Sequence, residues 1–483
     1  MSDVAQLLLP AIRWDPESGY DAAREDIERA LELGVGGFIL YGGEQDAVRA
    51  LTKELRQRAR HPILIAADLE RGAGQQFAGA TGLPPLAAIA SLGDLDAVRR
   101  AARLTARESR TMGVNWALAP VVDLDVLPEN PIIGSRSFGA DARRVASLAA
   151  AWIEACQAEG VLACAKHFPG HGRTLTDSHL TLPVVEASKA ELFDADLVPF
   201  QAAIRAGVAS IMTAHVAYPA LDPTGASATM SREMLRWLLR QQLKYDRLIV
   251  SDALDMEGVL AGRDEGAAAI AAINAGCDVI LAPSAVAAVA ETLEQALHRH
   301  ELDADRVERS ARRRLKWAGW ASPPNEYRKP SAADLAWGAQ LADRVVHIVR
   351  GTPPKVTTPL DVLIIDDDVG GPHPAPSREP FLDALRAGGR AARRVDAPRT
   401  EAGRTLIVAL FGEIRAWKGR AGYSEATREA VERACAAAPN AIVLLFGHPR
   451  LASEIPSAQT VVSAWGGEPA MQQAAARWLL RAR

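Results

Sequence analysis

The most reactive side chains of the chain are concentrated in residues 161–183, VLACAKHFPGHGRTLTDSHLTLP. An apolar run ends at Lys166 and His167, a Pro-Gly turn follows, and the segment closes with Asp177 and His179. Residues two apart point in different directions in an extended loop, but glycine and proline allow this loop to curl. In a curled loop Asp177 accepts a hydrogen bond from the imidazole, which fixes its tautomer and raises its basicity. The pattern predicts a histidine that donates a proton near neutral pH.

Other ionisable residues also follow apolar runs. Asp252 ends the run LIVSD, where a rigidly held carboxylate is suited to act as a nucleophile. Asp is also favoured at the N-cap of a helix, which is the structural alternative for Asp252. The carboxyl ends of parallel barrel strands meet at one mouth. The residues expected there are Asp68, Asp123, Lys166, His167, His215 and Asp252.

The side chains in this set suit a ligand rich in hydroxyl groups. Lys166 and His167 supply donors, and Asp68 supplies a bidentate acceptor. Arg136, in NPIIGSRSFG, adds a further donor, with a surface arginine as the alternative. These residues predict a small, polar substrate such as a sugar.

Metal binding is the weaker interpretation of the histidines in this loop. His171, Asp177 and His179 have ligand-capable side chains at close spacing. The loop lacks the helical HxxxH spacing, and a His/Asp pair serves acid-base chemistry as readily. We therefore expect neither a metal nor an organic cofactor. His215 is more typical of a satisfied histidine near the core.

The elements that must position these residues form a regular alternation. Helix-like segments such as YDAAREDIERALEL carry apolar residues at three- and four-residue spacing. They separate eight strand-like runs: LLLPAI, GGFILY, PILIAAD, NWALAPVVD, VLACAKHF, SIMTAHVAY, RLIVSDAL and CDVILAP. The alternation predicts an α/β fold with a (β/α)8 barrel over residues 1–320. An open doubly wound sheet is the structural alternative.

A second domain is predicted beyond a linker. The Pro-rich polar stretch SPPNEYRKPS predicts a linker at residues 321–335. The strand-like runs DVLIIDDD, TLIVALFG, AIVLLFG and TVVSAWG then predict a smaller α/β sandwich over residues 336–483. This domain lacks a phosphate-loop motif, and GVGG at 34–37 fits a helix C-cap. The run Asp366-Asp367-Asp368 is expected to be a solvated turn.

Composition narrows the class of protein. The 483 residues carry a net charge of -4, so no basic excess indicates nucleic-acid binding. The four cysteines are scattered singly, which predicts buried thiols. The N-terminus lacks a cationic segment followed by an apolar core, and no run approaches the ~20 apolar residues of a membrane span. A cytoplasmic location is expected.

Taken together, KHFPGHG followed by DSH, with NPIIGSRSFG and SDALDM, resembles the β-N-acetylglucosaminidase branch of glycoside hydrolase family 3. The resemblance extends from about Gly34 to Pro283 and more loosely through the second domain. It implies hydrolysis of a terminal β-linked N-acetylglucosamine on a barrel. The implied substrate is an oligosaccharide or a muropeptide fragment from cell-wall recycling.

The resemblance also implies roles for individual residues. Asp252 matches the nucleophile of a retaining, two-step mechanism, and His179, oriented by Asp177, matches the acid/base. A retaining pair is usually two carboxylates about 5 to 5.5 Å apart, so a histidine acid requires a mobile loop to bring it into place. The residues implied to bind the hydroxyl groups of the non-reducing sugar are Asp68, Arg136, Lys166 and His167.

Three positions depart from the family pattern. Arg71 replaces a glycine in DLERGAGQQF, Gln76 stands where an arginine is usual, and Arg173 stands where Asp or Asn is common. They bear on the exact sugar more than on the reaction. β-Glucosidase relatives place a glutamate acid on the second domain, for which Glu413 or Glu425 are candidates, but the intact DSH makes this unnecessary.

Two alternative functions remain. The first is another activity of the same family, a β-glucosidase or a phosphorylase that uses phosphate in place of water. The second is a catalytically idle sugar-binding protein, which the altered DLERG segment makes conceivable. The joint presence of Asp252, Asp177 and His179 argues for an enzyme.

Overall fold

The computed structural model of the chain describes residues 3–260, 263–321, 331–352, 356, 359–368, 375–398 and 403–481. It forms two compact units. Unit 1 comprises Met1–Thr81, Leu95–Val126 and Ala140–Ser331. Unit 2 comprises Gly82–Asp94, Leu127–Gly139 and Ala332–Arg483.

Residues 322–330 of the predicted linker lie outside the described residues, so the boundaries at 320 and 336 stay a prediction. The structure adds a feature that the sequence pattern did not indicate. Two segments from the first part of the chain, Gly82–Asp94 and Leu127–Gly139, pack with the last part in unit 2.

Unit 1 is built from parallel strands in two sheets, with the orders β1-β9-β8-β7-β6 and β2-β3-β4-β5. Only Pro10 separates β1 from β2, and a parallel bridge between Trp116 and Leu162 links β5 to the residues before β6. The pairings therefore follow the order of a TIM-like barrel, and the predicted fold class is confirmed. The strands are β1 (Leu8–Leu9), β2 (Ala11–Arg13), β3 (Gly37–Tyr41), β4 (Leu64–Ala67), β5 (Trp116–Ala117), β6 (Cys164–Phe168), β7 (Ser210–Thr213), β8 (Leu248–Ala253) and β9 (Val279–Leu281).

The strands of unit 1 are apolar because both of their faces are covered. Neighbouring strands contribute Ile39, Trp116, Met212 and Val250 to one buried core. The indole nitrogen of Trp116 donates to the hydroxyl of Ser210 at 2.8 Å, so its polar tip is satisfied inside this core. All strands run parallel, so their carboxyl ends lie at the same end of the unit and carry the loops with ionisable residues.

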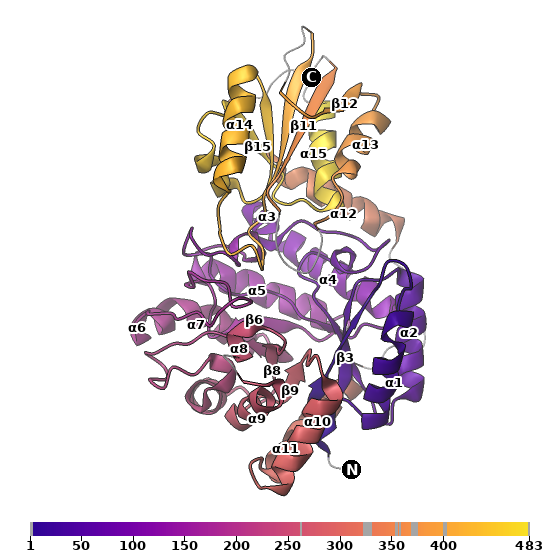
Figure 1. Cartoon of the computed structure of the whole chain (residues 1–483), viewed down its shortest axis with the longest axis vertical. Coiled ribbons are helices and arrows are strands. Elements are labelled where there is room, and N and C mark those ends of the chain that lie inside the picture. Colours follow the sequence, from indigo (N-terminus) through magenta and orange to yellow (C-terminus); the bar gives the residue numbers. More distant parts are fainter. Residues whose placement is uncertain are drawn as a thin grey trace. The chain divides into compact units, whose positions relative to one another are not determined.

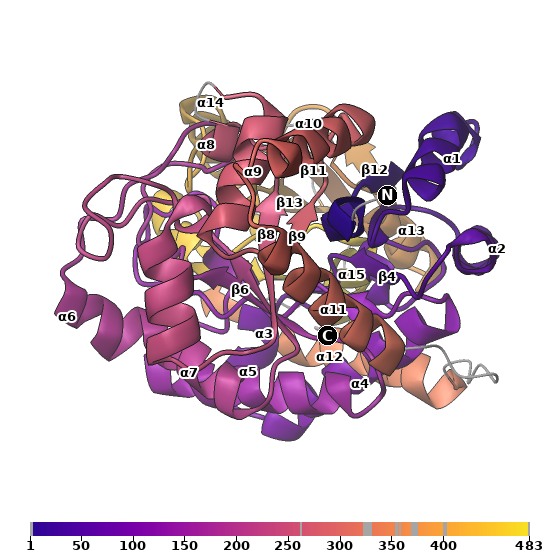
Figure 2. The ribbon, with the colours of Figure 1, turned by 90° about the horizontal axis from the view of Figure 1, so that it is seen from below.

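Amphipathic helices connect these strands and lie around them in Figure 2. α1 ends at Gly34, whose left-handed backbone (φ +77°) confirms the C-cap predicted for GVGG. The helices are α1 (Arg24–Leu33), α2 (Gln45–Arg58), α4 (Leu95–Thr111), α5 (Ala142–Gln157), α6 (Lys189–Glu191), α7 (Leu197–Arg205), η7 (Glu233–Gln242), α8 (Glu257–Leu260), α9 (Glu265–Ala275), α10 (Val286–His298) and α11 (Ala304–Trp320).

Unit 2 contains a six-stranded sheet with the order β10-β15-β14-β13-β11-β12, in which only β10 is antiparallel to its neighbour. The α14 helix lies on one face of the sheet, and α13 and α15 lie on the other (Figure 1). The strands are β10 (His347–Arg350), β11 (Leu360–Asp366), β12 (Ala392–Val395), β13 (Thr405–Phe411), β14 (Ile442–Phe446) and β15 (Thr460–Ser463). The helices are α3 (Leu86–Ser91), α12 (Ala332–Val345), α13 (Glu379–Ala387), α14 (Glu425–Ala437) and α15 (Pro469–Arg481).

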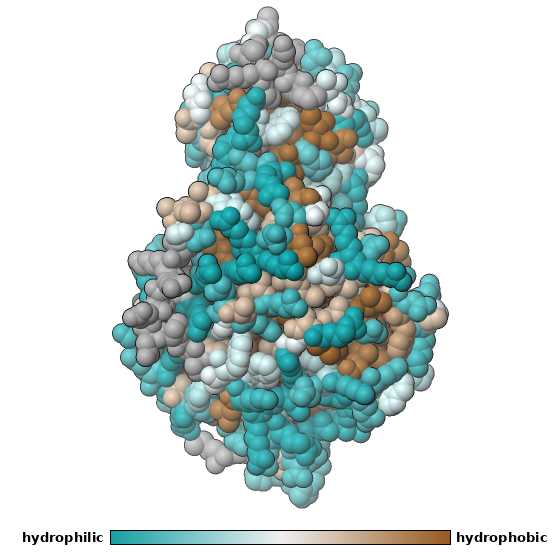
Figure 3. All heavy atoms as spheres, turned by 180° about the vertical axis from the view of Figure 1, so that it is seen from behind, coloured by the Kyte–Doolittle hydropathy of each residue, from teal (hydrophilic) through white to brown (hydrophobic). Residues whose placement is uncertain are grey.

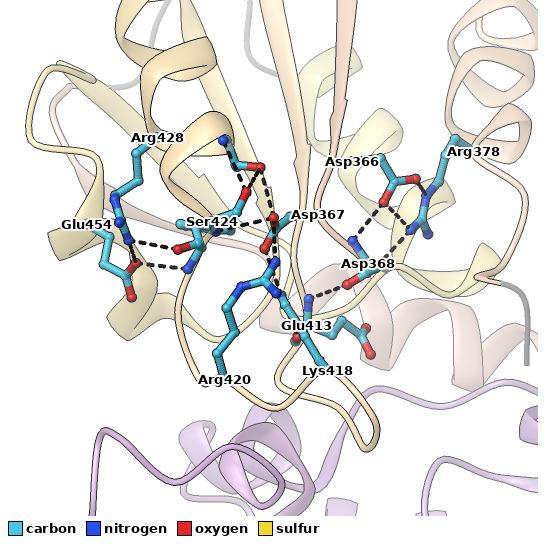
Figure 4. Close-up of polar contacts among 12 residues, drawn as sticks. Asp366, Asp367, Asp368, Arg378, Glu413, Lys418, Arg420, Ser424, Arg428 and Glu454 are labelled. Atoms are coloured by element: carbon cyan, nitrogen blue, oxygen red, sulfur yellow. Dashed lines mark hydrogen bonds and ion pairs between the residues drawn. The ribbon is translucent and has the colours of Figure 1, made fainter. Parts of the chain in front are cut away.

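The aspartate run after β11 is not the solvated turn expected from the sequence. Asp367 and Asp368 are only 2% and 9% exposed. Both carboxylates are paired with cations, Asp367 with Lys418 at 3.0 Å and Asp368 with Arg378 at 2.8 Å (Figure 4). The run lies at the carboxyl end of a central strand, where neighbouring loops cover it.

Hydrophilic residues predominate on the face drawn in Figure 3, where hydrophobic residues form separate patches. Within the described ranges, none of the helices is long and apolar enough to cross a membrane. All four cysteines are free and buried, as predicted.

Candidate active site

Lys166 lies in the middle of β6, and its side chain lies between two carboxylates. Its ammonium nitrogen is 2.7 Å from Asp68 Oδ1 and 2.8 Å from Glu70 Oε1, and its side chain is 2% exposed. A buried cation requires such partners, because removing it from water costs several kcal/mol. The side chain of Asp68 is 26% exposed and keeps a surface for further hydrogen bonds. Glu70 was not among the predicted site residues.

His167 is held by Asp123, which lies at the end of the run that follows β5. The His167 Nδ1 lies 2.6 Å from Asp123 Oδ2, and the backbone N–H groups of His167 and His171 donate to the same carboxylate. Burial raises the pKa of Asp123, but the charges of the two histidines and their hydrogen bonds bring it below its ordinary value. Asp123 is therefore an ionised acceptor that fixes the start of the reactive loop.

Asp177 and His179 are brought together by the curled loop that follows β6. The His179 Nδ1 lies 2.7 Å from Asp177 Oδ1, and the backbone N–H of His179 donates to the same oxygen at 2.9 Å. The backbone N–H groups of Leu180 and Thr181 donate to the carbonyl of Asp177, which closes the turn. Asp177 is fully buried as a side chain, whereas the imidazole is 21% exposed. Because Nδ1 faces the carboxylate, Nε2 is the ring nitrogen that points away from Asp177.

Asp252 lies near the end of β8, within electrostatic reach of three imidazoles. Burial raises its pKa, but the charges of His167, His215 and His179, with the N–H of Ala253, lower it to about 2. The Ala253 N–H donates to Asp252 Oδ1 at 2.8 Å. The helix that follows, α8, begins five residues later, so the N-cap alternative does not hold. Asp252 is thus an ionised carboxylate within electrostatic reach of His179.

The same surroundings include Asp68 and Tyr41. Burial and then the charge of Asp68 raise the pKa of Tyr41 well above its ordinary value, and Asp252 acts on Tyr41 in the same direction. Burial also raises the pKa of Cys164 to about 12, and the charges of Lys166, Asp68 and Asp252 all reach that thiol. The sequence-predicted residues Asp68, Lys166, His167, His179 and Asp252 therefore belong to one electrostatic neighbourhood.

His215 supports the strand that carries Asp252. The His215 Nδ1 lies 2.8 Å from Thr229 Oγ1, and its Nε2 lies 3.0 Å from the carbonyl oxygen of Ala253. Burial is the main cause that lowers the pKa of His215. It is a buried histidine with both nitrogens engaged, which agrees with the interpretation from the sequence.

The histidines considered as metal ligands are occupied by other partners. The His171 Nδ1 lies 2.8 Å from Thr174 Oγ1, and its Nε2 lies 2.9 Å from Ser178 Oγ. Burial lowers the pKa of His171 to about 4, so the ring is neutral near pH 7. Among the residues that the structure describes, no group of three His, Cys, Asp or Glu side chains is arranged to hold a metal ion.

Arg136 belongs to unit 2. It lies in the short helix η4 (Gly134–Arg136), where its Nη1 donates to the carbonyl of Ile132 at 3.3 Å. Its contact with a sugar therefore stays a prediction. The alternative acid Glu413 also belongs to unit 2. Its Oε1 accepts from the backbone N–H of Gly467 at 2.7 Å, and its own N–H donates to Asp368 at 2.6 Å (Figure 4).

The three residues that depart from the family pattern make hydrogen bonds or ion pairs with other residues of unit 1. Arg71 is 9% exposed, and its backbone N–H donates to Gln75 Oε1. Gln76 accepts a hydrogen bond from the backbone N–H of Gly42 at 3.2 Å. Arg173 pairs with the buried Asp196 at 2.8 Å. Each of the three residues thus makes a hydrogen bond or an ion pair within unit 1, through its side chain or its backbone.

Comparison with known proteins assigns the class. A family model described as "Glycosyl hydrolase family 3 N terminal domain" matches residues 2–316. A match of this extent defines an enzyme that cleaves glycosidic bonds. The chain belongs to glycoside hydrolase family 3.

Individual relatives agree with this assignment. A β-N-acetylglucosaminidase/β-glucosidase from Cellulomonas fimi is 41% identical over 258 residues, which cover 52% of this chain and 46% of that protein. A β-hexosaminidase from Methylobacillus flagellatus is 35% identical over 274 residues, covering 54% of this chain and 77% of that protein. The match thus spans about half the length of the first relative.

A solved structure resembles the whole chain. The glycoside hydrolase family 3 β-N-acetylglucosaminidase from Paenibacillus sp. str. FPU-7 matches with a TM-score of 0.85 at 27% sequence identity. The match covers 99% of this chain and 96% of that one, so the barrel and the sandwich both have counterparts there.

Proposed function

We propose that this protein removes terminal β-linked N-acetylglucosamine by retaining, two-step hydrolysis. One observation carries the proposal: Asp177 holds the imidazole of His179, and the charge of His179 is among those that lower the pKa of Asp252. An acid/base and a nucleophile must share one substrate, and the electrostatic interaction between His179 and Asp252 supports this pairing. The names of the relatives support the sugar class.

In the first step His179 is the acid and Asp252 the nucleophile. An Asp252 oxygen attacks the anomeric carbon while the bond to the leaving oxygen breaks. The proton on His179 Nε2 passes to that oxygen, and the negative charge of Asp177 stabilises the imidazolium beforehand. The products are the free alcohol and a glycosyl ester on Asp252.

In the second step His179, now neutral, is the base. It takes a proton from water, the water oxygen attacks the anomeric carbon, and the ester bond to Asp252 breaks. Lys166, Asp68 and His167 would hold the sugar hydroxyl groups through both steps. The fixed positions of these side chains reduce the entropy lost in reaching the transition state.

The natural substrate in this proposal is a muropeptide fragment in the cytoplasm. The resemblance of the reactive loop to the β-N-acetylglucosaminidase branch supports this choice. No metal or organic cofactor takes part in the proposed steps, since the proton and the nucleophile both come from side chains.

A screen of aryl glycosides tests the proposal. We expect turnover of the N-acetyl-β-glucosaminide well above that of the β-glucoside, with no dependence on added phosphate. Asp252→Ala should lower kcat/KM by at least about a thousandfold, because the covalent intermediate cannot form. Preference for the glucoside, or a rate that requires phosphate, would favour the other family activities. Binding without turnover at any pH would favour the idle sugar-binding protein.

A further inference from the structure

Three apolar side chains of the loop that carries His179 are largely exposed. Leu175, Leu180 and Val184 are 64%, 47% and 49% exposed. Burial of these three side chains therefore contributes little to the position of the segment. Ser178, between the two residues of the acid/base dyad, is 1% exposed instead. The contacts of Ser178 lead to two other parts of the site.

The first contact is made by the side chain of Ser178. Its hydroxyl lies 2.9 Å from Nε2 of His171. His171 is itself fixed at both ends, because its Nδ1 meets Thr174 and its backbone N–H donates to Asp123 at 2.7 Å. Asp123 also holds His167. The serine hydroxyl is thereby connected to the residues at the end of β6.

The second contact is made by the backbone of Ser178. The N–H of Gly258 donates to the carbonyl of Ser178 at 3.1 Å. Gly258 lies in α8, six positions after Asp252 in the same connection from β8. A Cβ atom at Gly258 would lie 2.3 Å from that carbonyl oxygen and 2.9 Å from the carbonyl of Thr181. Both distances are shorter than a carbon and an oxygen tolerate, so any side chain at 258 displaces the loop.

We propose that His171, Ser178 and Gly258 are positioning residues that hold the imidazole of His179 at its working distance from Asp252. The proposal rests on the proposed function, in which these two groups act on one substrate. His171 sets the loop relative to the sugar-binding end of β6, and Gly258 sets it relative to the nucleophile. None of the three positioning residues touches the reacting atoms in this scheme. Their loss should therefore weaken proton transfer and leave the attack of Asp252 intact.

The test compares two variants with two matched controls. Gly258→Ala adds a methyl group against the loop, and Ser178→Ala removes the hydroxyl. Gly319→Ala is the control for the first, because a Cβ there meets nothing within 4 Å. Ser109→Ala is the control for the second, because Ser109 is a buried serine of α4 that donates to the carbonyl of Thr105.

Leaving-group dependence separates positioning from general damage. We expect Gly258→Ala to lose kcat/KM on the order of 100-fold for an alkyl N-acetylglucosaminide, whose poor leaving group needs the proton. For a dinitrophenyl N-acetylglucosaminide, the rate of leaving-group release should stay within about threefold of the parent rate. Azide, which needs no base, should accelerate the second step in the variant and not in Gly319→Ala. Equal losses on both substrates, or no loss on either, would overturn the proposal.

A second measurement does not depend on activity. Amide hydrogen exchange of residues 177–181 should become about tenfold faster in Gly258→Ala and Ser178→Ala, and stay at the parent rate in the two controls. Unchanged exchange in both variants would overturn the proposal. Failure of the proposed function would look different, since the parent protein itself would then cleave no N-acetylglucosaminide, while faster exchange would still support the holding role of the three residues.

Discussion

At the scale of single residues, charge decides which carboxylate can act as the nucleophile. Asp252 is ionised because the charges of His167, His215 and His179, with a backbone hydrogen bond, lower its pKa by more than burial raises it. A carboxylate with a pKa of about 2 attacks without prior loss of a proton across the working pH range. The pH dependence of the reaction must then come from another group, and His179 is the group that changes protonation in both proposed steps.

A pH profile of the His179→Ala variant tests this division of roles. We expect kcat/KM for a dinitrophenyl N-acetylglucosaminide to be flat from about pH 5 to pH 8 in the variant. The substitution removes one of three imidazoles that lower the pKa of Asp252, so that pKa rises. Even at the ordinary value of 3.8, however, the carboxylate stays ionised above about pH 5. For the same substrate, kcat of the parent protein should change with pH, because hydrolysis of the glycosyl ester needs His179 as the base, whereas kcat of the variant should not. A change that persists in the variant would assign the pH dependence to a different residue.

The sequence predicts these residues to different extents. Asp177 and His179 could be paired from their spacing in a glycine-containing loop, and Asp252 from its place after an apolar run. Glu70 was missed, although it follows Asp68 by two positions and therefore has the same side-chain direction in an extended segment. The role of His171 could not be predicted, because its partners depend on how the loop curls.

At the scale of elements, the sequence predicts the strands that fill the cores of the two units. It does not predict the strands at the edges of the six-stranded sheet. All eight runs of the first domain contain the strands β1 to β9, and β11, β13, β14 and β15 match the runs of the second. β10 and β12 lie at the two edges of the six-stranded sheet. Their sequences, HIVR and ARRV, carry charged residues and are partly exposed, as edge strands often are. An apolar-run criterion cannot detect such strands.

The buried carboxylate of Asp367 holds the second half of the connection from β13 to α14. Its Oδ1 accepts from Arg420 Nη2 at 2.8 Å and from Thr427 Oγ1 at 2.9 Å (Figure 4). The Lys418 ammonium lies 3.0 Å from Oδ2, with its side chain fully buried. Burial raises the pKa of Asp367, but Lys418 and the hydrogen bonds bring it below its ordinary value.

Asp367→Asn should destabilise unit 2 by roughly 3 to 5 kcal/mol, because the variant leaves the Lys418 cation buried and uncompensated. The measurement is urea unfolding followed by hydrogen exchange of amides in β11 and β13. Asp383→Asn, in α13 of the same unit, is the control, since that side chain is 69% exposed and its pair with Arg386 at 3.6 Å should be worth less than about 1 kcal/mol. The difference between the two variants should shrink as the pH falls, because Asp367 has a lowered folded-state pKa and its contribution is lost on protonation. Equal effects of both variants would refute the special role of Asp367.

At the scale of the whole molecule, the order of the sequence does not match the division into units. Ala87 and Ala88 of α3 lie in the same buried core as Trp465 and Met471. Gly134 also packs against the last part of the chain, since a Cβ on it would lie 2.7 Å from Ile414 Cδ1. Both segments are connections after barrel strands. Periodicity within a segment shows that it has an apolar face, but does not show which distant segment covers that face.

This interleaving predicts how the chain behaves when it is cut. A protease site introduced between residues 321 and 331 would divide the sequence into an N-terminal and a C-terminal fragment. The N-terminal fragment retains α3, which forms part of the core of unit 2. We therefore expect the two fragments to elute as one species in size-exclusion chromatography after cleavage, and to separate only in denaturant. Fragments that part under native conditions would contradict the prediction.

A core variant shows whether α3 is responsible for the association. Ala88 is fully buried, so Ala88→Asp places an unpaired carboxylate in the apolar core of unit 2. Ser91→Ala is the control on the same helix, because Ser91 is only part-buried and its hydroxyl bonds to the carbonyl of Ala88 within that helix. The cut Ala88→Asp protein should dissociate at a lower urea concentration than the cut parent, whereas the cut Ser91→Ala protein should resemble the parent. If Ala88→Asp has no effect, the fragments are held together without a contribution from the α3 core.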